Sequence, residues 1–173
     1  VIYFERIISM SAVKEVLRSS VMLSSLGEDD ISMIEKMGKT ERYSEFDIVL
    51  KEGAVNHFLY IVIWGSVSVV QENTHLGILE KGQHFGEMSL LDGQLIAANV
   101  VANKDTTVWM ISHTQIMDFI SHPDSNGERV LMALSKQLCQ RLRSTDTALR
   151  EANKRNIIDE NQLNSFLSEL NSS

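Results

Sequence analysis

The spacing of apolar positions changes twice along the chain. Up to about residue 40 the spacing is helical, and Gly38 ends a second short helical segment. From residue 41 to about 112 the chain breaks into short β-type runs separated by glycine and polar residues, and helical spacing returns after Ile111. The first helical segment carries its apolar side chains at Ile7, Ile8, Val13, Val16 and Leu17.

The central region contains six short runs typical of β-strands. The run from Phe58 is apolar almost throughout to Val70, which indicates strands buried on both faces. Many short strands with closely spaced turns predict a closed barrel or a sandwich, so the fold class is mainly β with flanking helices. The runs are Phe46–Leu50, Phe58–Trp64, Val67–Gln71, Leu76–Leu79, Ala97–Ala102 and Thr106–Ile111.

The carboxy-terminal third is predicted to be helical. A short helix over Thr114–Ser121 ends at His122-Pro123, a long helix follows over about 126–155, and a separate helical piece covers about 158–170. We expect four parts: amino-terminal helices over 1–40, a barrel over 41–112, helices over 113–155, and a short helix or flexible tail over 156–173.

One apolar stripe on the long helix needs a partner surface. We favour a parallel homodimer, with packing on the chain's own barrel as the alternative. Thr145 and Leu149 extend this stripe, but its spacing decays after Leu142, so the pattern does not predict a long coiled coil. The expected dimer seam consists of Leu131, Leu134, Leu138 and Leu142.

Composition narrows the class of protein. The chain is 43% hydrophobic and 23% charged with a net charge of −7, which is ordinary for a globular domain and unfavourable for direct binding to nucleic acid or anionic membranes. Residues 128–155 carry a net charge of +4, whereas the rest of the chain carries −11. This basic segment is either a solvated helix face or a surface for an acidic protein partner. The single Cys139 predicts a packed thiol in a reducing compartment, and we expect a cytoplasmic protein without a membrane span.

The segment 82–98 carries the most informative motif. A Phe-Gly-Glu turn at residues 85–87 opens a single helical turn, and the chain re-enters a strand through Ala97-Ala98. Backbone amides that converge at such a turn are unpaired donors suited to an anion. Nothing in the sequence matches a nucleophile elbow, a phosphate loop or a zinc-protease motif, so we do not expect an enzyme.

Residues 85–91, Phe-Gly-Glu-Met-Ser-Leu-Leu, resemble the phosphate-binding cassette of cyclic-nucleotide-binding domains. The turn at Glu52-Gly53, the strand pair over 59–69 and Gly82 resemble that family in the same order. The resemblance implies a jelly-roll barrel and a regulatory role with cAMP or cGMP as the ligand. It implies that Glu87 accepts a hydrogen bond from the ribose hydroxyl of the ligand. It also implies that the backbone amides of Gly86, Met88 and Ser89 bind the cyclic phosphate.

At one position of the cassette, this sequence departs from the pattern of the family. The family places an arginine before a pair of small residues, and here Ile96 precedes Ala97 and Ala98. Loss of a charge-assisted hydrogen bond of roughly 1.5–3 kcal/mol weakens binding about 10- to 150-fold. Two hypotheses follow: a sensor with a modified ligand site, or a nucleotide-free domain acting in dimerisation and protein–protein interaction.

Several of these residues also have purely structural interpretations. Gly86 can serve only as a positive-φ turn, Glu87 as a partner of a backbone amide or a lysine, and Ser89 as a local cap. We expect His75 and His84 to be exposed turn residues and Trp64 and Trp109 to belong to the barrel. The predicted site residues are Phe85, Gly86, Glu87, Met88, Ser89, Ile96, Ala97 and Ala98.

Overall fold

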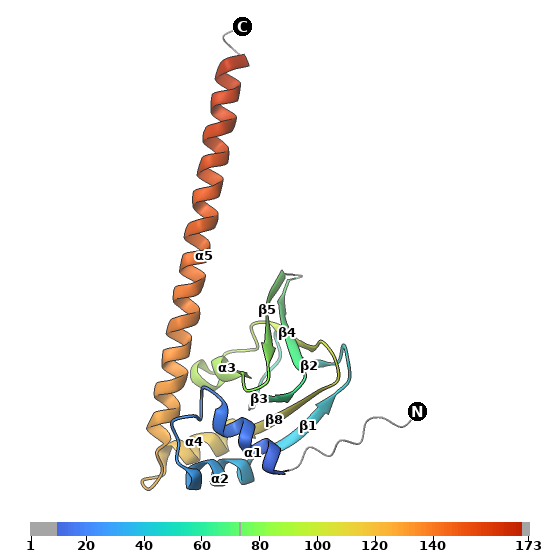
Figure 1. Cartoon of the computed structure of the whole chain (residues 1–173), viewed down its shortest axis with the longest axis vertical. Helices are drawn as coiled ribbons and strands as arrows, with labels where there is room; N and C mark the ends of the chain where they lie inside the picture. Colours follow the sequence, from blue (N-terminus) through green and yellow to red (C-terminus); the bar gives the residue numbers. More distant parts are fainter. Residues whose placement is uncertain (1–9, 73, 171–173) are drawn as a thin grey trace. The chain divides into compact units, whose positions relative to one another are not determined.

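The computed structural model describes residues 10–72 and 74–170 (Figure 1). Ile7 and Ile8, which belong to the expected first helix, lie outside the described residues. The chain divides into two compact units, residues 1–134 and 135–173. The first unit contains the two β-sheets and the shorter helices.

Eight strands form two four-stranded antiparallel sheets in the first unit. One sheet has the order β1 (Lys39–Tyr43), β8 (Thr106–Ser112), β3 (Phe58–Trp64) and β6 (His84–Phe85). The other has the order β2 (Ile48–Leu50), β7 (Asn99–Ala102), β4 (Ser66–Gln71) and β5 (Thr74–Glu80). This arrangement confirms the mainly β fold that the pattern of short strands predicted and the jelly-roll barrel that the resemblance implied.

Strand β3 is apolar on both faces because each face packs against a different cluster of buried side chains. Its residues Leu59, Ile61 and Ile63 join a cluster with the helices, whereas Tyr60 and Val62 face a second cluster inside the barrel. Side chains alternate across a strand, so a strand covered on both sides reads as a continuous apolar run.

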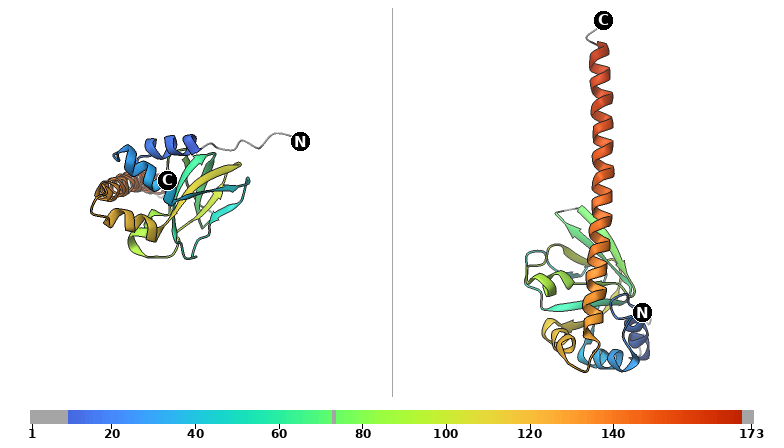
Figure 2. Two further views of the ribbon diagram at one scale, coloured as in Figure 1. Left: turned by 90° about the horizontal axis from the view of Figure 1, so that it is seen from below. Right: turned by 90° about the vertical axis from the view of Figure 1, so that its left-hand side faces the viewer.

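The helices of the first unit gather on one side of the barrel (Figures 1 and 2). They are α1 (Met10–Ser19), α2 (Glu28–Met37) and α4 (His113–Ser121), while the short α3 (Glu87–Asp92) lies in the predicted cassette. Ser112 caps α4 in a capping box with Gln115, whose side-chain amide also donates to the carbonyl of Met37 (2.9 Å). The cap therefore joins the end of β8 to α2 and α4.

The helix α5 (Gly127–Leu170) differs from the expectation. It runs for 44 residues without a break, so residues 158–170 are part of it rather than a separate helical piece. The physical reason is that no glycine or proline follows Gly127 to interrupt the backbone hydrogen bonds. Cys139, expected as a packed thiol, is exposed on this helix.

Along the expected dimer seam, burial changes within two turns of α5. Leu134 is fully buried in the cluster with the helices, and Leu131 and Leu138 are half-buried. Leu142 is 63% exposed. The stripe therefore divides between core packing at its beginning and an open surface at its end.

Candidate ligand-binding site

The cassette begins with a sharp turn between β6 and α3. Gly86 adopts a left-handed conformation with φ +84°, and Glu87 starts the helix. A Cβ atom at Gly86 would lie 2.7 Å from the carbonyl oxygen of Phe58 and 2.9 Å from Nδ2 of Asn56. Both the dihedral angle and the close approach require glycine at this position.

Both ends of the cassette are attached to one short segment, residues 53–56. The amide of Gly53 donates to the carbonyl of Ile96 (2.8 Å), and the amide of Ile96 donates to the carbonyl of Ala54 (2.9 Å). At the other end, Nδ2 of Asn56 donates to the carbonyl of Gly86 (3.2 Å). These hydrogen bonds fix both ends of the loop.

Asn56 is a site residue that the sequence analysis missed. It is buried, its Nδ2 also donates to the carbonyl of Phe58 (2.7 Å), and its Oδ1 accepts from the Phe58 amide (3.0 Å). Asparagine before a strand is a common turn residue, and that was the available signal. Its contact with Gly86 spans 30 residues and leaves no local pattern.

The predicted residues at the start of the cassette have different exposures. Phe85 and Glu87 are buried, Gly86 and Ser89 are half-buried, and Met88 is 50% exposed. Glu87 also takes part in an interaction within the protein. The structure therefore provides one buried carboxylate directly after the left-handed turn at Gly86.

The end of the cassette is apolar. Ile96 is only 8% exposed and packs in the barrel cluster with Phe85, Tyr60 and Val100. Ala97 is exposed and Ala98 is half-buried. Since the chain has no lysine or arginine between Lys81 and Lys104, no cation follows the cassette turn in sequence.

Aromatic and imidazole rings lie beside the turn. The rings of Tyr60 and Phe85 are stacked with centroids 4.8 Å apart, and burial raises the pKa of the Tyr60 phenol. Burial lowers the pKa of His113 from its ordinary value of 6.5, and His57 acts in the same direction, while backbone groups of Phe58 and Gly86 oppose the shift. His113 is therefore a second residue near Gly86 that sequence reasoning did not identify.

The histidines and tryptophans named in the sequence analysis differ in burial. His84 is buried, which contradicts its expected exposure, because it lies in β6 and pairs with Ile61; His75 is exposed as expected. Trp109 is buried in the core cluster and Trp64 is 41% exposed on β3. Among residues 11–72 and 74–154, whose side chains the structure describes, no group of three or more His, Cys, Asp or Glu side chains is arranged to hold a metal ion.

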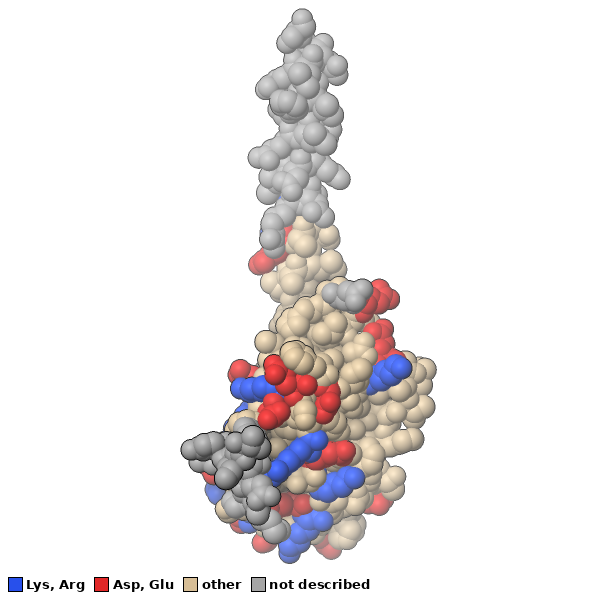
Figure 3. All heavy atoms as spheres, turned by 90° about the vertical axis from the view of Figure 1, so that its right-hand side faces the viewer, with Lys and Arg blue, Asp and Glu red and all other residues tan. Residues whose placement is uncertain are grey.

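Charge is mixed on the barrel face shown in Figure 3. Acidic and basic side chains lie next to one another there, so this face presents no patch of a single sign. No helix in the described part of the chain has both the length and the apolar character needed to cross a membrane.

Comparison with known proteins agrees with this geometry. Residues 40–122 match the family model described as the cyclic nucleotide-binding domain. A cGMP-dependent protein kinase of Plasmodium berghei is 26% identical over 111 residues, which is 64% of this chain and 13% of the kinase. The barrel belongs to the cyclic nucleotide-binding domain family. The chain spans about an eighth of that relative's length.

Solved structures show the same fold. The catabolite activator protein of Thermus thermophilus superposes with a TM-score of 0.67 and 25% identity, over 75% of this chain and 62% of that one. The regulatory subunit of a cAMP-independent protein kinase A from Trypanosoma brucei gives a TM-score of 0.64 and 22% identity, over 74% of this chain and 45% of that one. This cyclic nucleotide-binding domain therefore resembles regulatory parts of larger proteins.

Proposed function

We propose that this domain is a non-catalytic, cytoplasmic regulatory module in signal transduction that binds a cyclic nucleotide or a related phosphorylated ligand in a modified site. The main support is the attachment of both cassette ends to residues 53–56, which fixes the two ends of the loop. In this proposal Glu87 accepts a hydrogen bond from a ribose hydroxyl, and the backbone amides of Gly86, Met88 and Ser89 face the phosphate. The ligand candidates are cAMP and cGMP.

Ile96 sets the expected strength of binding. The backbone amides remain as neutral donors, whereas the position that would supply a cation is aliphatic and buried. A missing charge-assisted hydrogen bond is worth roughly 1.5–3 kcal/mol, so we expect an affinity about 10- to 150-fold below that of a site with the cation.

A second function is a nucleotide-free domain that acts in dimerisation and protein–protein interaction. The observation that favours it is the packing of Ile96 with Phe85 and Tyr60, which fills space at the cation position with apolar side chains. The Trypanosoma relative, described as part of a cAMP-independent kinase, is compatible with a domain of this family that works without cAMP.

Calorimetric titration with cAMP and with cGMP separates the two functions. The sensor function predicts saturable heat with the wild type and its loss in Glu87→Ala, provided that near-ultraviolet circular dichroism shows an intact fold. The matched control is Asp118→Ala, which removes an exposed carboxylate from α4, outside the cassette, and should leave binding unchanged. Absence of heat up to millimolar ligand rejects the cyclic-nucleotide function and leaves the nucleotide-free one.

A further inference from the structure

Two arginines stand close before Ser144 on α5. Arg141 lies three positions before it and Arg143 one position before it, and no other serine or threonine of the chain has two arginines among its three preceding residues. Residues 141–154 carry four basic and two acidic side chains, a net charge of +2. Enzymes discriminate protein substrates partly by charge, so this pattern favours an enzyme whose peptide-binding surface is acidic.

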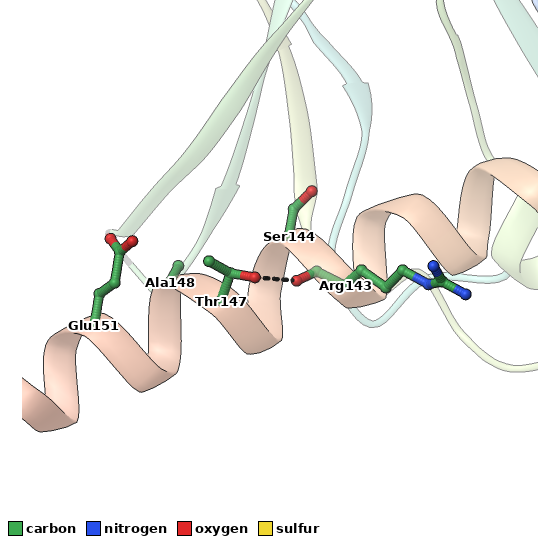
Figure 4. A pocket seen from close by; sticks show the side chains of 5 residues that line it. All are labelled: Arg143, Ser144, Thr147, Ala148 and Glu151. Carbon is green, nitrogen blue, oxygen red and sulfur yellow. Dashed lines mark hydrogen bonds between the residues drawn. The ribbon is translucent and has the colours of Figure 1, made fainter.

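Ser144 lies in an exposed part of the helix, since residues 141–154 are all exposed. Figure 4 shows Arg143 and Ser144 projecting from different sides of α5, with Glu151 about two turns beyond Ser144. Residues three and four positions away share the helix face of Ser144, and none of them is acidic. These neighbours are Gln140, Arg141, Thr147 and Ala148. The surroundings of the Ser144 hydroxyl on its own face are therefore neutral or basic.

The helix around Ser144 is intrinsically weak. Serine and threonine are poor helix formers, and three of them fall within four residues here. The Ser144 hydroxyl donates to the carbonyl of Gln140 (2.9 Å), and Thr145 and Thr147 make the same contact four residues back (3.0 and 2.9 Å), which slightly destabilises a helix. Because no residue of 141–154 is buried, opening this turn loses little packing. Local opening can therefore present Ser144 in an extended segment to an enzyme.

We propose that Ser144 is a phosphorylation site for a protein kinase that recognises arginine before its acceptor. In the reaction Oγ of Ser144 forms a bond with the γ-phosphorus of ATP, the bond from that phosphorus to the β,γ-bridging oxygen breaks, and ADP leaves. The hydroxyl proton passes to a carboxylate base of the kinase and from there to solvent. Arg141 and Arg143 pair with carboxylates on the peptide-binding surface of the kinase.

The two neighbouring threonines are poorer acceptors than Ser144. Thr145 lies on the apolar stripe of the helix, three residues after Leu142. Thr147 directly follows Asp146, whose charge repels an acidic peptide-binding surface. Both threonines also carry a branched Cβ atom, which hinders the approach of their hydroxyl groups to a phosphorus atom. Charge and shape therefore both favour the serine.

Phosphorylation changes the charge of this segment. A phosphoserine carries a charge of about −1.5 to −2 at neutral pH, which offsets the net charge of +2 on residues 141–154. On the closed helix Arg141, three residues before the phosphate, lies within reach of its oxygens. The modification thus removes the electrostatic attraction of the segment for an acidic surface, and a phosphatase restores it.

Incubation of the full chain with Mg²⁺, radiolabelled ATP and a protein kinase that selects arginine three residues before its acceptor tests the site. We expect one phosphate per chain, located at Ser144 by tandem mass spectrometry and lost in Ser144→Ala. The matched control Thr147→Val removes a hydroxyl from the same helix face and should be phosphorylated as the wild type is. A wild type that takes up no phosphate, or Ser144→Ala that takes up as much as the wild type, overturns the proposal.

Substitution of the arginines tests how the kinase recognises the segment. Arg141→Gln should lower kcat/KM for phosphorylation at least about tenfold, because it removes a charge-assisted contact with the enzyme. Arg150→Gln removes the same charge from the chain after the acceptor and should leave kcat/KM unchanged. Equal effects of the two substitutions contradict recognition through Arg141.

Hydrogen exchange tests the local opening of the helix. The amides of residues 141–147 should exchange faster than the amide of Leu134, which lies on the same helix and is fully buried. Protection at Ser144 as strong as at Leu134 would show that the segment does not open and would reject the proposal. The outcome is independent of whether the barrel binds a ligand.

Discussion

The two ends of the cassette differ although both are attached to residues 53–56. The first end has Gly86 in the left-handed conformation and the buried Glu87. The second end has Ile96 packed in the barrel core and carries no charge. The backbone hydrogen bonds at the second end nevertheless have ordinary lengths of 2.8 and 2.9 Å.

The comparison separates the shape of the loop from its electrostatics. The shape depends on backbone dihedral angles, glycine and side-chain amides, none of which needs a bound anion. The charge depends on one residue, and an aliphatic side chain at that position gains burial in place of an ion pair with a ligand. A member of this family can therefore keep its cassette fold while its affinity for phosphate falls.

The largest effect on this comparison is expected from Gly86→Ala. An alanine here pays for its left-handed backbone and meets the Phe58 carbonyl oxygen at 2.7 Å, which together cost about 2–5 kcal/mol of unfolding free energy. Gly93 also has a positive φ, +67°, but its Cβ would have no neighbour within 4 Å, so Gly93→Ala should cost only about 1–2 kcal/mol. Urea unfolding measures both, and equal losses would show that the close approach at Gly86 is unimportant.

Asn56→Ala is expected to have the next largest effect. It removes the donor to Gly86 and both contacts with Phe58 in a buried place, so we expect a loss of about 2–3 kcal/mol. At the other end Asn99 is half-buried and accepts only from the Glu52 amide, and Asn99→Ala should cost about 1 kcal/mol. A larger loss for Asn99→Ala in the same urea experiment would reverse our ranking of the two ends.

The dependence of folding stability on pH should be a smaller effect, and it should arise at the Gly86 end of the cassette. His113 has its pKa lowered in the folded protein, so the unfolded chain binds more protons as pH falls through 6.5. Its contribution to stability is therefore complete above this pH and declines below it, towards the folded pKa. Urea midpoints between about pH 8 and pH 5 should fall less steeply in His113→Gln than in the wild type. Parallel profiles would exclude His113 as the source.

The sequence predicted the parts of the site that depend on local order. Phe85-Gly86-Glu87 was expected as a turn into a short helix, and Ile96 was expected at the position before the alanine pair. The contacts of Asn56 with Gly86 and the burial of His113 join segments far apart in sequence, and no local pattern encodes them. Strand β1 matches none of the predicted runs, because four of its five residues are polar and its partner is β8.

The carboxy-terminal helix was predicted only in part. Its helical character was predicted, but the expected break near residue 156 was wrong, since α5 continues to Leu170. Polar residues such as Asn156 lower local apolar content without ending a helix, since helix ends depend on caps, glycine and proline.

The most direct test of the account is the affinity of Ile96→Arg for cAMP and cGMP, measured by calorimetry beside the wild type and Ile96→Met. If the cassette lacks only its cation, the arginine variant should bind about 10- to 150-fold more tightly than the wild type. The methionine variant, long but uncharged, should bind as the wild type does. A folded arginine variant with no gain in affinity would contradict the claim that the cassette has kept its binding geometry.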